Sequence, residues 1–362
     1  MLLLAAAGTA VLGSGTASAA TAHGPVGGAW ALGDGSSAHE SATAARRGAR
    51  VNAVRERALR RARRAKAREV DPLAALPLYV EPGGPARAQA NAWRRARPGD
   101  AGLIDSIAQQ PQSLWLGDWR YDVRAEAARR VAAGRATGTV PVIVAYNLPN
   151  RDCGQHSSGG AAGAAQYRRW IDGLATGIGA APAIVVLEPD GLAGLGCLSA
   201  AQRRERMTLL TEAVDRLSHL PATAVYIDAG NPGWIPAGVM ARRLRAVGVS
   251  GARGFAVNVS GFETTRRALA FGRAISRRTS GAHFVVDTSR NGLGPLSRPQ
   301  WCNPPGRALG ERPTTETGDP RADAFLWIKR PGESDGTCNG GPPAGTWWPE
   351  YALGLAQRAA TP

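Results

Sequence analysis

The sequence predicts an α/β fold, a distorted (β/α) barrel of seven or eight parallel strands with the active-site cleft at the C-terminal strand ends. Short β-favouring runs alternate with helical stretches rich in Ala, Arg and Leu, and the runs start about 35 residues apart, which fits βα units. The runs are apolar throughout, as expected of strands buried on both faces. A doubly wound open sheet is the alternative.

The strands are expected at eight runs in order along the chain: Leu78–Val80, Leu114–Trp119, Val140–Asn147, Ile184–Asp190, Ala224–Asp228, Gly254–Val259, His283–Thr288 and Phe325–Lys329. Helices are expected between them, among them Ala125–Ala133, Ala164–Leu174, Ala200–Leu217 and Ala237–Val247. A helical crossover is the usual way to connect one parallel strand to the next.

The N-terminal part predicts export. Residues 1–20 contain an apolar stretch followed by Ala17-Ser18-Ala19, which is typical of a secretory signal peptide with its cleavage site. Residues 21–75 are expected to form a disordered linker and an Arg-rich segment, and residues 76–362 the catalytic domain. We therefore expect a secreted, extracellular protein that is a monomer and has no stable membrane anchor.

The net charge of +16 is concentrated in one segment. Eleven basic residues lie between Arg46 and Arg68 with Glu56 as the only acidic residue, so the rest of the chain is only mildly basic. This distribution does not indicate a nucleic-acid partner. The Arg-rich segment is either a mobile stretch before the domain or a means of adhesion to an anionic polymer.

Four cysteines, Cys153, Cys197, Cys302 and Cys338, agree with export. They allow three pairings, or four buried thiols in a cytosolic enzyme. Pairing of sequence neighbours, Cys153 with Cys197 and Cys302 with Cys338, would stabilise the fold by roughly 3–4 kcal/mol per bridge.

The motifs of several enzyme classes are missing from the sequence. There is no G-x-S-x-G after a strand, no H-E-x-x-H, no C-x-x-C and no phosphate-binding glycine loop. We expect no metal site and no cofactor.

Polar residues recur where the predicted strands end. They are Asn147, Glu188-Pro189-Asp190, Asp228, Asn258, Asp287 and Lys329. For any one of them a helix N-cap or a loop hydrogen bond is the commoner explanation, but six in register favour a shared site at the barrel mouth. Carboxylates together with ten tryptophans suit glycoside hydrolysis, in which acids act on the glycosidic bond and sugar rings stack on aromatic faces.

The chain resembles glycoside hydrolase family 6, the cellulases, over about residues 76–360. The likeness rests on Val144-Ala145-Tyr146-Asn147-Leu148-Pro149-Asn150-Arg151-Asp152-Cys153-Gly154 with Ser158-Gly159-Gly160, and on Val185-Val186-Leu187-Glu188-Pro189-Asp190-Gly191-Leu192. It continues through the blocks at 226–230, 287–292, 301–306 and 323–336.

The resemblance implies inverting cleavage of β-1,4-glucan. Asp190 matches the general acid, Asp152 the neighbouring carboxylate that raises the pKa of that acid, and Asp335 the candidate base. A water chain held by Ser158 and Asp152 is the alternative to a base. Inversion requires the acid and base carboxyl groups to lie about 6.5–9.5 Å apart.

The resemblance also implies a set of substrate-binding residues: Tyr146, Ser158, Asp228, Asn231, Trp234, Asn258, Trp301, Lys329 and Glu333. The alternative role of Asp228 and Arg151 is structural, to orient neighbouring side chains. The alternative role of the two tryptophans is packing in the core. The sequence departs from the family pattern at Asn231, where the family has His, and at Gly261-Phe262, where it has Tyr.

Short segments at 290–317 and 336–348 favour an open cleft, and so an endoglucanase that cleaves internal bonds. The alternatives are a cellobiohydrolase, an enzyme of the same fold acting on another β-glycan, and a non-catalytic polysaccharide-binding protein on the same barrel.

Overall fold

The computed structural model describes residues 71–359 except Pro299, together with isolated helical positions between residues 43 and 62. The chain divides into two compact units, residues 1–55 and 56–362, and the fold below is that of the second. The predicted signal peptide and most of the predicted linker lie outside the described residues. Among the described helices, none combines the length and the apolar character that a membrane crossing requires.

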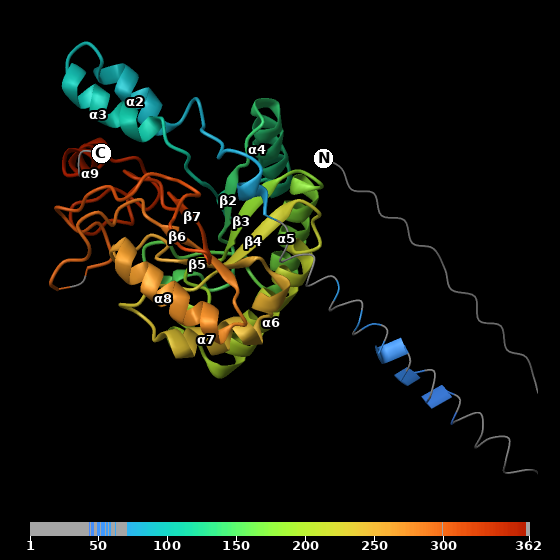
Figure 1. The fold of residues 1–362 in the computed structure, drawn as a ribbon. Helices are drawn as coiled ribbons and strands as arrows, with labels where there is room; N and C mark the ends of the chain where they lie inside the picture. The colour runs from blue at the N-terminus through green and yellow to red at the C-terminus, as the bar shows by residue number, and fades with distance from the viewer. Residues whose placement is uncertain are drawn as a thin grey trace, which may run out of the picture. The chain divides into compact units, whose positions relative to one another are not determined.

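Seven parallel strands form one curled sheet (Figure 1). They are β1 (Leu114–Leu116), β2 (Val142–Ala145), β3 (Ala183–Leu187), β4 (Thr223–Asp228), β5 (Gly254–Val257), β6 (His283–Asp287) and β7 (Ala322–Leu326). Each strand pairs with the next in sequence. A doubly wound sheet would reverse its strand order partway, so the barrel-type prediction is confirmed and the open-sheet alternative is wrong.

Helices surround the outer face of this sheet (Figure 1). They are α4 (Val123–Thr137), α5 (Ala164–Ile178), α6 (Ala200–Leu217), α7 (Ala237–Ala246) and α8 (Thr265–Arg278), and α2 (Pro85–Trp93), α3 (Pro98–Ala108) and α9 (Pro349–Gln357) pack together beside it. Short 3-10 turns are η1 (Pro72–Ala74), η2 (Asp152–Gly154), η3 (Ala193–Cys197) and η4 (Val249–Gly251). A capping box of Ser199 and Gln202 fixes the start of α6, where the prediction placed it.

The sheet separates two apolar layers. Alternate residues of β2 lie on opposite faces, with Ile143 packed towards the helices and Val142 and Val144 packed inside the curl. Both faces are therefore buried, which explains why the strands read as continuous apolar runs. The two edge strands approach at one end, where the Trp115 indole N–H donates to the Ile328 carbonyl oxygen at 2.8 Å.

The first of the eight predicted strands, Leu78–Val80, is wrong. Leu78 makes only an isolated parallel bridge with Val140, and Val80 is exposed. Pro77 and Pro82 flank this run, and proline lacks the N–H that a ladder needs. β7 also lies earlier than predicted, so Lys329 follows the strand by three residues instead of ending it.

Candidate active site

The loops after the strands hold their polar residues in strained backbone. Among the described residues, every non-glycine residue with a positive φ except Ser280 lies in a loop that follows a strand at its C-terminal end. These residues are Asn150, Asp152, Cys153, Glu188, Asp190, Asn258, Ser260, Asn303 and Asn339. Strain of this kind persists where surrounding contacts enforce it, and it clusters at functional sites. The predicted location of the site agrees with this concentration.

Asp190 lies just after β3 with φ of 67°. Burial, and secondly the negative charge of Asp152, raise the pKa of the Asp190 carboxyl to about 7. A hydrogen bond from the Tyr146 hydroxyl opposes this rise, and the charge of Asp335 adds to it. The charges of Asp152 and Asp335, the other two predicted catalytic carboxyls, therefore both raise the pKa of Asp190.

Glu188 ties the loop after β2 to the end of β3. Its buried carboxylate accepts the Asn147 N–H at 2.9 Å and the Leu148 N–H at 3.1 Å. Burial raises the pKa of Glu188 to about 7, against the effect of these hydrogen bonds. From α6, the buried Arg206 donates to the carbonyl oxygens of Pro149 and Asn150. The segment that leads into Asp152 is thus held from two sides.

Asp152 begins η2 on that segment and is half-buried. Its carboxylate accepts the Ser157 N–H at 2.7 Å, and burial raises the pKa of Asp152 above its ordinary value. The buried Arg151 donates to the Ser157 and Ser158 carbonyl oxygens at 2.7 and 3.1 Å. Ser158 is exposed on this loop. Arg151 therefore fixes the loop that would hold a water chain.

Tyr146 is almost fully buried directly after β2. Its ring meets Trp115 edge-on, with centroids 5.2 Å apart, and Trp119 at 6.5 Å. The Arg151 guanidinium lies 4.7 Å from the centre of the Tyr146 ring. Tyr146 thus connects an aromatic group on the β1 side to Asp190.

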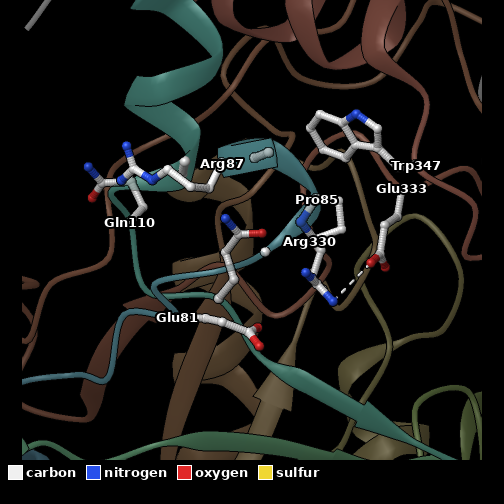
Figure 2. A pocket seen from close by; sticks show the side chains of 11 residues that line it. Glu81, Pro85, Arg87, Gln110, Arg330, Glu333 and Trp347 are labelled. Atoms are coloured by element: carbon white, nitrogen blue, oxygen red, sulfur yellow. Dashed lines mark ion pairs between the residues drawn. The ribbon is translucent and has the colours of Figure 1, made fainter. Parts of the chain in front are cut away.

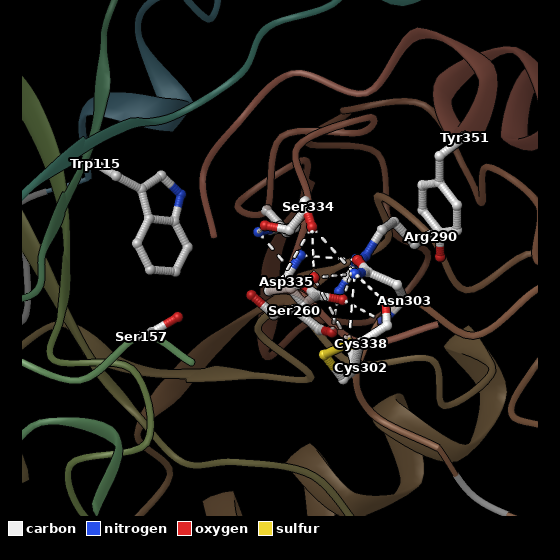
Figure 3. A network of polar contacts seen from close by, with 12 residues as sticks. Trp115, Ser157, Ser260, Arg290, Cys302, Asn303, Ser334, Asp335, Cys338 and Tyr351 are labelled. Carbon is white, nitrogen blue, oxygen red and sulfur yellow. Dashed lines mark hydrogen bonds and ion pairs between the residues drawn. A yellow bond between two sulfur atoms is a disulfide. The ribbon is translucent and has the colours of Figure 1, made fainter. Parts of the chain in front are cut away.

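Asp335 lies at the centre of a buried ionic network (Figure 3). Its carboxylate accepts from the Arg290 guanidinium at 2.8 Å and the Asn303 backbone N–H at 2.9 Å, and Lys329 Nζ lies 3.3 Å away. Burial acts to raise the pKa of Asp335, but Arg290 and Lys329 outweigh it and lower the pKa below the ordinary value. Asp335 is therefore a stably ionised carboxylate, and an ionised carboxylate with a low pKa is a weak base.

Glu333 points to a different place. Its carboxylate pairs with Arg330 at 3.1 Å, and both line a small pocket with Trp347 and residues around the start of α2, including Glu81 and Arg87 (Figure 2). Lys329, by contrast, is directed to Asp335 and the Ser334 carbonyl oxygen. Lys329 and Glu333, the two predicted sugar-binding residues of this segment, thus have different partners and lie in different surroundings.

Two predicted substrate contacts, Asn258 and Asp228, use their side chains in hydrogen bonds to the protein backbone. Asn258 is fully buried, and its amide donates to the Glu263 and Asp287 carbonyl oxygens while its oxygen accepts the Glu263 N–H. Asp228 is also buried and accepts the backbone N–H groups of Asp190 and Gly230. The Asn258 side chain is used within the protein, and the Asp228 carboxylate accepts both backbone N–H groups through the same oxygen. Both side chains support the loops in which they lie.

Three other predicted residues lie at the surface. The exposed fractions of Trp234 and Trp301 are 49% and 53%, which contradicts core packing for these two indoles. Asn231 is half-buried, and its side-chain oxygen accepts the Gly233 N–H at 3.0 Å. This turn shapes the loop that carries Trp234.

Both disulfides join cysteines that are consecutive along the chain, Cys153 with Cys197 and Cys302 with Cys338. This confirms one of the three possible pairings. His156 lies near the Cys302–Cys338 bridge. Because the two sulfur atoms of the bridge are bonded to each other, His156, Cys302 and Cys338 do not form a metal site. The His156 ring lies 5.9 Å from that of Trp301, and a Cβ at Gly336 would come within 2.4 Å of His156 Cβ. The two disulfide-bearing loops therefore touch.

Sequence reasoning missed several residues that hold the site. Arg290 and Asn303 bind Asp335, Glu188 and Arg206 hold the loop after β2, and Asp118 binds Arg151 at 2.7 Å. Glu188, Arg290 and Asn303 lie inside the motifs of the family resemblance, but no role was predicted for them. Arg206 lies outside these motifs and carried no signal, because its partners Pro149 and Asn150 are distant in sequence.

A parallel α/β barrel with buried carboxyls and exposed indoles after its strands has the arrangement of a glycoside hydrolase. The model of the family described as glycosyl hydrolases family 6 matches residues 73–359. The chain belongs to this family.

Similar proteins include Endoglucanase A of Cellulomonas fimi, 47% identical over 74% of this chain, and Endoglucanase 1 of Streptomyces halstedii, 43% identical over 76%. The matches span 59% and 86% of those proteins, so the chain covers less than two thirds of the first. Among solved structures, the endoglucanase Cel6 of Mycobacterium tuberculosis, in complex with methyl-cellobiosyl-4-deoxy-4-thio-β-D-cellobioside, is 49% identical with a TM-score of 0.76. That similarity covers 79% of this chain and 98% of the other.

Proposed function

We propose that this chain hydrolyses internal β-1,4-glucosidic bonds of cellulose or a related β-glucan with inversion, and that Asp190 is its general acid. The observation that carries the proposal is the pKa of about 7 for the Asp190 carboxyl, raised by burial and by the charge of Asp152. A carboxyl group with this pKa keeps its proton near neutral pH and donates it to a leaving oxygen.

In the proposed reaction, Asp190 protonates the glycosidic oxygen as its bond to C1 breaks. A water molecule attacks C1 from the opposite face, and the product carries the inverted, α configuration. Tyr146, next to Asp190, presses on the sugar ring at the point of cleavage.

The attacking water must lose a proton. Asp335 is paired with Arg290 and Lys329, and its lowered pKa makes it a poor acceptor. Asp152, whose pKa is raised and whose loop carries Ser157 and Ser158, is the better terminus for a water chain. We assign Asp335 a supporting role: it stays ionised between Arg290 and Lys329, and its charge adds to the raised pKa of Asp190.

The endoglucanase assignment is supported by the relatives, which bear that name. A cellobiohydrolase is the second candidate, and one observation favours it: the loop of His156 touches the loop of Trp301 and Gly336. Such a contact would enclose the substrate. The ratio of viscosity loss to reducing ends on carboxymethylcellulose separates the two, because internal cleavage lowers viscosity early.

Proton NMR of fresh products tests the reaction. We expect the wild-type chain to release the α-anomer from β-glucan, and Asp190→Ala to abolish release while binding persists. Asp172→Ala, an exposed aspartate on α5, is the control and should keep wild-type turnover. Release of the β-anomer would exclude inversion. Binding without hydrolysis by the wild type would favour the polysaccharide-binding protein.

We also propose that the protein is secreted and acts as a monomer without a membrane anchor. Disulfides form and persist in oxidising compartments, and the two bridges support this location. Cleavage after Ala19 or Ala20, read by mass spectrometry of the protein from culture medium, tests export.

A further inference from the structure

Trp119 is an exposed indole that the proposed reaction leaves without a role. It lies in the loop after β1, three residues beyond Leu116. Its exposed fraction is 50%, close to those of Trp234 and Trp301, the two indoles that the family resemblance identifies as sugar platforms. Tryptophan is enriched at binding surfaces, because its indole offers a large apolar face together with one polar N–H.

Contacts from three directions fix the indole of Trp119. The Arg151 guanidinium lies 5.0 Å from its ring centre, and the Tyr146 ring meets it at an angle of 62°. Its six-membered ring lies against the backbone of Gly117, where an added Cβ would come within 2.3 Å of it. The half of the ring that stays in solvent is therefore held in one orientation before any ligand arrives.

The anchor of Trp119 is itself rigid. Arg151 is buried and donates to Asp118 at 2.7 Å, to the Tyr146 carbonyl oxygen at 2.9 Å and to the loop of Ser157. The cation–π contact with Arg151 stabilises one face of the indole, and half of the Trp119 side chain still lies in solvent. Packing on Arg151 alone therefore does not account for the exposure of Trp119.

Trp119 is one aromatic ring away from the proposed acid. Tyr146, which contacts Trp119, is hydrogen-bonded to Asp190. A polysaccharide chain that passes Asp190 carries further glucosyl rings on either side of the cleaved bond. The C–H faces of such rings are apolar and flat, and they stack on indoles.

We propose that Trp119 is a further platform for a glucosyl ring of the substrate, on the β1 side of Tyr146. The assignment rests on the proposed β-glucan hydrolase function. Stacking on one indole lowers the Michaelis constant of substrates long enough to reach it, and it leaves the proton transfer at Asp190 unchanged.

The experiment compares three variants on barley β-glucan, cellohexaose and cellotriose. Trp119→Ala should raise KM for the two longer substrates roughly three- to tenfold with kcat within twofold. Trp119→Phe, which keeps a flat ring, should lie between this variant and the wild type. The control is Tyr121→Ala: Tyr121 is fully exposed two residues further along the same loop, and its removal should change no constant.

The effect should shrink with cellotriose, because a short chain need not reach Trp119. The platform is overturned if Trp119→Ala and Tyr121→Ala give the same constants, or if only kcat falls. If Trp119→Ala does not fold, the same readings are taken from Trp119→Phe, and an unchanged KM there also overturns it. Inactivity of the wild type on all three substrates would instead refute the proposed function.

Discussion

The backbone N–H of Asp190 donates to the Asp228 carboxylate at 3.0 Å, and the Gly230 N–H donates to the same oxygen at 3.1 Å. Asp228 ends β4 and is buried, so it connects the loop of the proposed acid to the neighbouring strand. Burial and the charge of Asp190 raise the pKa of Asp228 well above its ordinary value. The backbone position of the proposed acid therefore depends on the buried carboxylate of Asp228.

Removal of this support should lower turnover. We expect Asp228→Ala to reduce kcat up to about 100-fold, since small misplacements of a reacting group have effects of that size, and to leave KM within threefold. Steady-state kinetics on soluble β-glucan measure both constants. A rise in KM at unchanged kcat would show that Asp228 binds sugar directly.

The raised pKa of Asp190 predicts that this side chain lowers the free energy of unfolding at neutral and alkaline pH, although the proposed reaction requires it. Its folded-state pKa of about 7 lies above the unfolded value, so the folded state loses stability as the pH rises from about 4 to about 7. Asp190→Asn removes this loss. Its melting temperature should exceed that of the wild type by a few degrees at pH 8 and match it at pH 4. Equal melting temperatures at both pH values would mean that Asp190 titrates normally.

A second ionic network stabilises the opposite end of the barrel. Asp323 accepts two hydrogen bonds from Arg253 at 2.8 Å and one each from Tyr226 and His283. Although burial acts to raise its pKa, these bonds lower the pKa of Asp323 to about 2. The stability it contributes is therefore present above about pH 4 and is lost as the pH falls towards 2.

Asp323→Asn weakens the hydrogen bonds of the buried Arg253, which keeps Asp71 as a charged partner at 2.9 Å. Loss of charged hydrogen bonds of this kind costs roughly 1.5–3 kcal/mol. Denaturant unfolding at pH 7 should show this loss, and kcat of the folded variant should stay within twofold of wild type. A loss below about 1 kcal/mol, or a large fall in kcat, would contradict the purely structural role.

The disulfide Cys153–Cys197 fixes the residue directly after Asp152. The double variant Cys153→Ser/Cys197→Ser should lower the free energy of unfolding by about 3–4 kcal/mol. It should also lower kcat at temperatures where it remains folded, because the Asp152 loop gains freedom. The matched Cys302→Ser/Cys338→Ser variant separates a general stability effect from one on Asp152. Equal kcat losses in the two pairs would argue against a specific role.

The fold could be predicted because the strands are short and apolar on both faces, and because all of them except β6 are followed by a helix. The positions of Asp190 and Asp228 after β3 and β4 followed from the same pattern. The strand predicted at Leu78–Val80 is wrong because the run is apolar but is flanked by Pro77 and Pro82, which interrupt the hydrogen bonds of a strand.

Side-chain partners were less predictable. A strand-end position places Asn258 near the barrel mouth, but only the surrounding backbone decides that its amide is used inside the protein. The pairing of Asp335 with Arg290 joins residues 45 positions apart, and their spacing carries no trace of it. Consequently the strand-end position of Asp190 was predictable, whereas the pairing of Asp335 with Arg290 was not.

The pH dependence of kcat in Asp152→Asn tests most directly whether Asp190 is an acid kept protonated by its neighbour. In the wild type, kcat should fall as the pH rises through about 7, because Asp190 must hold its proton. Loss of the Asp152 charge should move this alkaline limb to lower pH. An alkaline limb that stays in place, or moves to higher pH, would contradict the account.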